Sequence, residues 1–212
     1  RKAAEDIVNG CTFDNNLPCI AEKEIVAVDS IADELMHYMV SEQGCYLASK
    51  EEQDALTEVV LKGGKLNRKC VGRDAKTLLG MIGVQVPDNI RCITFEGPKE
   101  HPLIATELMM PILGVVRAKD FDDAVEQAVW LEHGNRHSAH IHSKNVDNIT
   151  KYAKAIDTAI LVKNGPSYSA LGFGGEGFCT FTIASRTGEG LTSASTFTKR
   201  RRCVMTDSLC IR

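Results

Sequence analysis

Apolar positions along the chain follow two alternating spacings, and this alternation predicts the fold. Short runs rich in Ile, Val and Leu indicate strands buried on both faces of a sheet, and the segments between them repeat apolar residues with helical spacing. We predict strands at residues 24–29, 90–95, 111–117, 138–143 and 159–162, and helices at residues 3–8, 30–39, 49–60, 74–82, 120–133 and 146–156. Strands that alternate with helices predict an α/β fold with a mainly parallel open sheet covered by helices on both faces.

Polar residues and glycines predict where several of these helices begin and end. Ser30 with Asp33, and Ser49 with Glu52, match the spacing of a capping box at a helix start. The first helix is expected to end at residues 9–10, an Asn-Gly pair of the kind that commonly closes helices.

The pattern changes after residue 164, and no helical periodicity returns. A turn cluster at 164–167 leads into a glycine-rich stretch at 171–177 and then a Thr-rich alternating stretch at 178–184. Residues 196–212 are expected to form an extended strand. We therefore divide the chain into a domain at 1–177 and a return segment with a terminal strand at 178–212.

Composition excludes several classes of protein. The chain has 212 residues, of which 43% are hydrophobic, and a formal net charge of −3. This charge does not favour a nucleic acid or a membrane surface as partner, and no apolar run approaches the ~18 residues that would cross a bilayer. Eight cysteines without a C-x-x-C pair argue against a zinc site or a disulfide scaffold and favour free thiols in a reducing cytosol. Because the chain begins at Arg1 rather than Met, we expect it to be a fragment.

Cys19 is the candidate nucleophile. Pro18 fixes its own φ and favours an extended Leu17, so Cys19 should lie on a defined bend rather than inside a regular element. A rigidly held thiol on a loop can attack an electrophile. The alternative is that Cys19 is a small buried apolar residue, as many free cysteines are.

Three other motifs invite functional interpretations that we do not favour. Gly172, Gly174 and Gly177 match G-x-G-x-x-G, but they lead into strand-like sequence rather than a helix, so a flexible turn is the better interpretation. The histidines at 133, 137, 140 and 142 lack a third ligand at a convincing spacing and are interpreted as structural, with no metal. The basic run at 199–202 stands alone in an acidic chain, which favours a charged strand edge over nucleic-acid binding.

The segment around Cys19 resembles a known family. The run Phe-Asp-Asn-Asn at 13–16, then two residues and Cys19, then Ala-Glu-Lys-Glu at 21–24 and a strand, is similar to the nucleophile segment of the CoA-acylating aldehyde dehydrogenases of ethanolamine and propanediol breakdown. Hydrolytic aldehyde dehydrogenases usually carry Gly and Gln where this chain has Asn16 and Leu17. The resemblance covers the whole chain and is most specific at 13–24, 107–111, 164–177 and 196–203.

The resemblance implies a function and its residues. Cys19 would attack a short-chain aldehyde, propionaldehyde or acetaldehyde, and hydride would pass to NAD. The resulting thioester on Cys19 would then be resolved by coenzyme A. Glu107 would bind the ribose next to the nicotinamide, and Phe173 would place an aromatic ring near the aldehyde pocket.

The resemblance also implies an organisation. The NAD-binding domain would precede Arg1, so the isolated chain is expected to be inactive, and the terminal strand would pair with another subunit of a homo-oligomer. The enzyme would be cytoplasmic or enclosed in a bacterial microcompartment. Two alternatives remain open, a hydrolytic aldehyde dehydrogenase and a non-catalytic assembly module.

Overall fold

The computed structural model describes residues 1–177, 179–183 and 190–206. The strands are β1 (Glu24–Val28), β2 (Cys45–Leu47), β3 (Cys92–Glu96), β4 (Ile112–Ala118), β5 (Ser138–Ile141) and β6 (Ile160–Lys163). The α-helices are α1 (Lys2–Thr12), α2 (Asp29–Glu42), α3 (Lys50–Val60), α4 (Ala75–Met81), α5 (Pro102–Ala105), α6 (Phe121–Leu131) and α7 (Val146–Ile156). Short 3₁₀ helices are η1 (Phe13–Asn16), η2 (Lys62–Gly64), η3 (Ser167–Leu171) and η4 (Ala194–Phe197).

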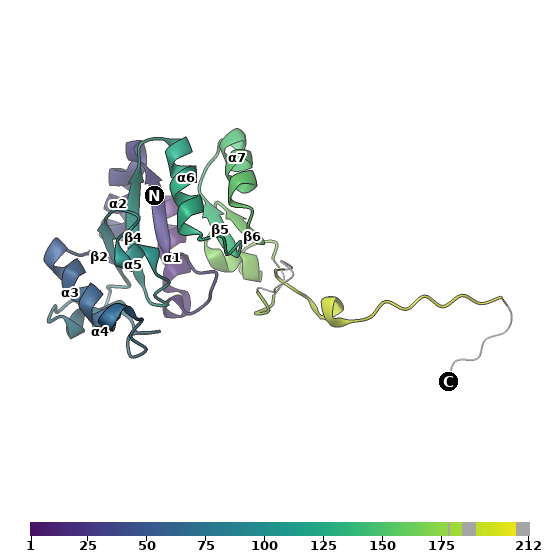
Figure 1. Cartoon of the computed structure of the whole chain (residues 1–212), viewed down its shortest axis with the longest axis horizontal. Helices are drawn as coiled ribbons and strands as arrows, with labels where there is room; N and C mark the ends of the chain where they lie inside the picture. Colours follow the sequence, from purple (N-terminus) through teal and green to yellow (C-terminus); the bar gives the residue numbers. More distant parts are fainter. Residues whose placement is uncertain (178, 184–189, 207–212) are drawn as a thin grey trace.

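The main sheet has four parallel strands in the order β1-β4-β3-β2 (Figure 1). Glu24 of β1 lies opposite Gly114 of β4, and Ile93 of β3 lies opposite Ile112. Parallel neighbours need crossover connections, and the helices between the strands provide them. The α/β class and the parallel sheet predicted from the sequence are confirmed.

Two apolar cores lie on opposite faces of this sheet. Leu113 and Val115 of β4 pack with the buried residues of α1 and α2. Ile112 and Val116 of the same strand pack with those of α3, α4 and α5 on the other face. Alternate residues of a strand point to opposite faces, so two covered faces account for the unbroken apolar run of β4.

The strands β5 and β6 form a separate two-stranded parallel sheet, whereas the alternation had predicted a single sheet. Ala139 of β5 packs with Val125 of α6 and with Tyr152 and Ile156 of α7. The free edges of β1 and β5 both line a cavity between the two sheets. This division is the main departure from the predicted architecture.

Some predicted boundaries are confirmed and others are wrong. The capping box of Ser49 and Glu52 is present, and α7 has its predicted bounds. The capping box at Ser30 is wrong, because α2 already begins at Asp29 without a side-chain cap. The first helix continues through Gly10 to Thr12. The short elements β2 and α5 were not predicted.

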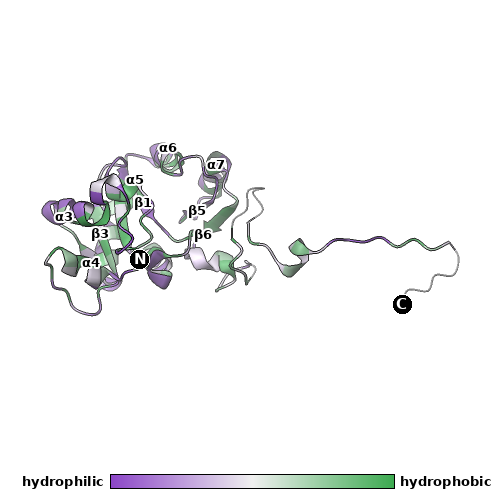
Figure 2. Cartoon of the chain, turned by 60° about the horizontal axis from the view of Figure 1, so that its bottom comes forward, coloured by the Kyte–Doolittle hydropathy of each residue, from purple (hydrophilic) through white to green (hydrophobic). Residues whose placement is uncertain are grey.

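The strand predicted at residues 196–212 does not form in the part of it that the structure describes. Residues 194–197 form η4, and residues 198–206 run away from the body without strand pairing, with a hydrophilic stretch around the basic residues (Figures 1 and 2). The strand predicted at 178–184 is wrong for its described residues, because 179–183 form bends and irregular backbone. The rest of that prediction, at 178 and 184, and the end of the chain at 207–212 lie outside the described residues. None of the described helices has the length and apolar character needed to cross a membrane.

We expect Gly114→Ala to lower the free energy of unfolding by about 1–3 kcal/mol, because the new methyl group would overlap Cγ1 and Cδ1 of the buried Ile104. Gly80→Ala in α4 is the control, since nothing lies within 4 Å of its added Cβ, and it should stabilise by about 0.5–1 kcal/mol. Urea denaturation of both variants measures the difference. Equal stabilities would contradict the close packing of α5 on β4.

Candidate active site

The segment before Cys19 turns through three consecutive residues in the left-handed region. Asp14, Asn15 and Asn16 have φ values of 47°, 49° and 65°. Asp and Asn enter this region more readily than other residues with side chains. The Asp-Asn-Asn run is therefore suited to this backbone, and the bend begins before Pro18, from which it had been predicted. The prediction of an extended Leu17 is wrong, because this residue has helical angles (φ −71°, ψ −37°) at the end of η1.

The side chain of Asn16 closes this turn from inside. It is only 1% exposed. Its Nδ2 donates to the carbonyl oxygens of Cys11 (3.0 Å) and Glu22 (2.8 Å), and its Oδ1 accepts from Nζ of Lys23 (2.7 Å). One amide thus connects the end of α1 with the residues that enter β1.

Glu22 is a second buried connection. The backbone N–H of Ser167 donates to its Oε1 at 2.9 Å, and burial raises the pKa of this carboxyl to about 7. Its Oε2 lies so close to Gly10 that a Cβ there would collide with it. Gly10 is therefore explained by close packing of α1 on a carboxyl group, and not by the helix end predicted from the sequence.

The turn holds Cys19 at the surface. Its neighbour Ile20 is 1% exposed and packs with the buried residues of β6 and η3, whereas Cys19 itself is exposed. Partial burial raises the pKa of the Cys19 thiol, its own backbone N–H and Lys23 oppose this rise, and Glu107 adds to it. The thiol is accessible and lies within electrostatic range of a cation and an anion.

The structure brings Glu107 to the same place, although it lies far from Cys19 in the sequence. Its Oε1 is 3.6 Å from Nζ of Lys23, and its side chain is 57% exposed. The loop around Gly72 supports this arrangement, because its carbonyl accepts from Asn15 (3.1 Å) and its N–H donates to the carbonyl of Met109 (2.9 Å). An exposed carboxylate beside the thiol can accept hydrogen bonds from sugar hydroxyls.

Phe173 lies against the start of the nucleophile segment. Its ring centroid is 6.1 Å from that of Phe13 and 6.3 Å from that of Tyr168, and the rings of Phe13 and Tyr168 are 5.4 Å apart. The Phe173 side chain is also 55% exposed. The ring of Phe173 thus contacts those of Phe13, in η1, and Tyr168, in η3. Gly172 follows η3 with φ of 89°, as in a turn.

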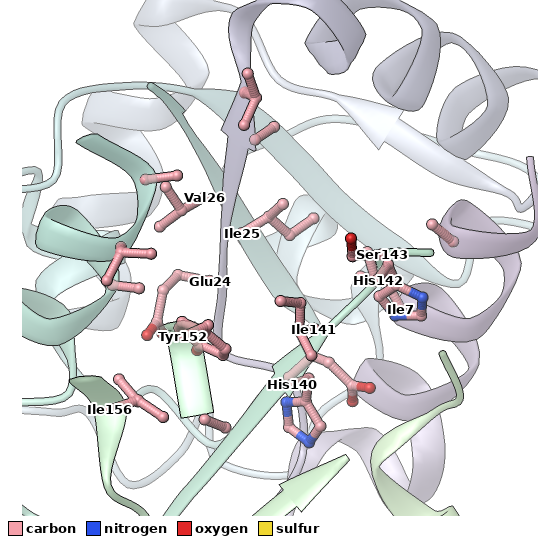
Figure 3. A pocket seen from close by; sticks show the side chains of 18 of the residues that line it. Ile7, Glu24, Ile25, Val26, His140, Ile141, His142, Ser143, Tyr152 and Ile156 are labelled. Carbon is pink, nitrogen blue, oxygen red and sulfur yellow. The ribbon is translucent and has the colours of Figure 1, made fainter. Parts of the chain in front are cut away.

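A cavity of about 540 Å³ lies between the edges of β1 and β5, and Cys19 is among its lining residues. Figure 3 shows Glu24 from β1, His140 from β5, His142 just after the end of β5, and Tyr152 from α7 around the cavity. Burial raises the pKa of Glu24 to about 7 and lowers that of His140 to about 4. The ring Nε2 atoms of both histidines are buried without a hydrogen-bond partner among the described residues. Among the residues that the structure describes, no group of three His, Cys, Asp or Glu side chains is arranged to hold a metal ion.

Comparison with known proteins identifies the family. No protein-family model matches the chain. It is 46% identical, over 98% of its length, to the acetaldehyde dehydrogenase (acetylating) EutE of Salmonella typhimurium. It also superposes over its whole length, with a TM-score of 0.94 and 82% identity, on a propionaldehyde dehydrogenase from the Clostridium phytofermentans fucose utilisation bacterial microcompartment. The chain belongs to the CoA-acylating aldehyde dehydrogenases. It spans 45% of EutE and 48% of the Clostridium chain.

Two further findings within this family concern individual residues. A propionaldehyde dehydrogenase of Rhodopseudomonas palustris, 53% identical with a TM-score of 0.92 over 96% of this chain and 47% of its own, has been solved with bound CoA and an acylated cysteine. The Clostridium enzyme has been solved with alanine in place of one histidine and, separately, of one cysteine. These two positions are as far apart in its sequence as Cys19 and His137 are here. His137 is one of the four histidines interpreted above as structural, and nothing in their spacing in the sequence distinguishes it from the other three.

We expect Cys19 to react with iodoacetamide faster than the buried Cys45 and Cys92, which are 2% and 0% exposed. Because the thiolate is the reactive form and partial burial raises the pKa of the Cys19 thiol, its labelling rate should continue to increase with pH after that of an unperturbed thiol has levelled off. Mass spectrometry of peptides after timed labelling measures each site. Labelling of Cys19 no faster than Cys45 would contradict its assignment as the nucleophile.

Proposed function

We propose that this chain is the catalytic part of an enzyme that oxidises a short-chain aldehyde, propionaldehyde or acetaldehyde, to its acyl-CoA with NAD. The observation that carries the proposal is the exposed Cys19 thiol, held on a hydrogen-bonded turn beside Glu107. The acylated cysteine and the bound CoA of the Rhodopseudomonas relative support it.

The proposed chemistry takes place on Cys19. Its thiolate attacks the carbonyl carbon of the aldehyde and forms a thiohemiacetal. Bound NAD supplies the hydride acceptor, and loss of hydride from this intermediate leaves a thioester on Cys19. The sulfur of CoA then attacks the thioester, the acyl group leaves as acyl-CoA, the thiol proton of CoA is released, and the Cys19 thiolate is regenerated.

Residues other than Cys19 also have proposed roles in binding or catalysis. Glu107 fits the nucleotide, because its exposed carboxylate can accept hydrogen bonds from both hydroxyls of a ribose. Phe173, with Phe13 and Tyr168, supplies an apolar wall for the alkyl group of the aldehyde. We include His137 because of the paired histidine and cysteine substitutions in the Clostridium relative.

The proposed organisation completes the enzyme. Residues 1–177 form the catalytic domain, a preceding domain of the longer protein binds the nucleotide, and the segment 178–212 extends to a second copy in a homo-oligomer. Residues 198–206 run away from the body without strand pairing (Figure 1), so their backbone N–H and C=O groups are available to a second copy. The microcompartment origin of the Clostridium relative supports the same location for this enzyme.

We expect the full-length enzyme to convert propionaldehyde to propionyl-CoA only when NAD and CoA are both present. Cys19→Ser should lower turnover by on the order of 10³-fold or more, because the thioester can no longer form. Cys203→Ser, at an exposed thiol in the C-terminal segment that runs away from the body (Figure 1), is the control and should retain activity. Product analysis by mass spectrometry distinguishes a CoA-acylating enzyme from a hydrolytic enzyme and from a non-catalytic assembly module. Free acid formed equally without CoA would indicate a hydrolytic enzyme, and no product from the wild type would indicate an assembly module.

Glu107→Gln should raise KM for NAD by about tenfold, because hydrogen bonds to a charged acceptor contribute about 1.5–3 kcal/mol. The melting temperature should not change, since more than half of the side chain is exposed. Glu126→Gln, on an exposed position of α6, is the matched control. An unchanged KM in the Glu107 variant would remove this residue from the nucleotide site.

A further inference from the structure

Lys23 connects the nucleophile turn to Glu107. Its Nζ donates to Oδ1 of Asn16 (2.7 Å), to the carbonyl of Asn16 (3.3 Å) and to the carbonyl of Pro18 (3.4 Å). The same atom lies 3.6 Å from Oε1 of Glu107. Pro18 precedes Cys19 directly, so one ammonium group contacts the peptide that orients the thiol and the carboxylate proposed to bind ribose.

This lysine is more buried than the other lysines that form ion pairs. Its side chain is 18% exposed, whereas those of Lys2, Lys50, Lys76 and Lys151 are at least half exposed. Burial lowers the pKa of Lys23, and Glu107 opposes this effect. Burying an ammonium group is costly unless oxygen atoms replace its water, and the three oxygens of the turn with the carboxylate of Glu107 provide that replacement.

Acidic side chains and thiols lie within electrostatic range of Lys23. Those that interact with it electrostatically are Glu22, Glu24, Glu107, Cys11 and Cys19. Within this group Lys23 supplies the positive charge. It favours the thiolate of Cys19, whereas Glu107 disfavours it.

We propose that Lys23 is a positioning residue that couples the orientation and ionisation of Cys19 to the nucleotide contact of Glu107. The proposal rests on the proposed function. If it holds, loss of the ammonium group changes both the reactivity of Cys19 and the binding of NAD. A lysine that only stabilised the fold would change neither in the molecules that remain folded.

The first test follows the pH dependence of Cys19 alkylation by iodoacetamide in the full-length protein. Lys23→Gln keeps an amide donor and removes the charge, so the midpoint of the alkylation profile should rise by about one pH unit. Lys23→Arg keeps the charge and should leave the midpoint near that of the wild type. Lys151→Met, which removes an exposed ion pair with Asp122, is the matched control and should not move it.

The second test measures steady-state kinetics of the same variants with NAD. Lys23→Gln should raise KM for NAD and lower kcat together, whereas partial unfolding would lower kcat alone. A folded Lys23→Gln protein with the wild-type alkylation midpoint, or an unchanged KM, overturns the proposal.

A third variant keeps the proposal testable if Lys23→Gln does not fold. Glu107→Gln removes the opposing charge, so the Cys19 midpoint should move to lower pH, and an unmoved midpoint overturns the coupling. Alkylation does not require turnover. Failure of acyl-CoA formation would therefore overturn the proposed function and leave the effect of Lys23 on Cys19 to be judged by the alkylation profiles.

Discussion

The amide of Asn16 donates to two carbonyl oxygens and accepts from Lys23, and these bonds close the segment between α1 and β1. A buried polar side chain of this kind is stable only when its donors and acceptors are satisfied. The left-handed turn that precedes it, the packing of Ile20 in the core beyond it and the exposure of Cys19 all follow from that closure. The candidate site is therefore built around a hydrogen-bonded turn and not around a regular element.

Buried carboxyl groups impose a second constraint on the same region. Glu22 is buried just before β1, and Glu24, the first residue of β1, is half-buried against the cavity; burial raises the pKa of each to about 7. Lys23 lies between them in the sequence and contacts the turn and Glu107. The three consecutive charged residues Glu22, Lys23 and Glu24 therefore have different neighbours. Lys23 and Glu107 act in opposite directions on the thiol, so the ionisation of Cys19 depends on both.

The relation between the two sheets determines what lies beside the turn. Glu22 and Lys23, which directly precede β1, both line the cavity between the free edges of β1 and β5. Glu22 also lies against Gly10 of α1 and accepts a hydrogen bond from the backbone N–H of Ser167 in η3. A parallel strand with an unpaired edge leaves backbone N–H and C=O groups without strand partners. The turn that carries Cys19 contacts β6 and η3 through Ile20, and it contacts α1 through Asn16.

Elements with strong periodicity, such as α7 and the buried strand β4, can be predicted from the amino-acid pattern alone, because such patterns depend on local geometry. The Phe-Asp-Asn-Asn run before Cys19 also identified the family. Three features became visible only in the folded chain: Gly10 lies inside α1 against Glu22, Glu107 lies beside Lys23, and β5 and β6 form their own sheet. These features depend on contacts between residues far apart in the chain, and the distances over which local patterns act do not extend to such contacts.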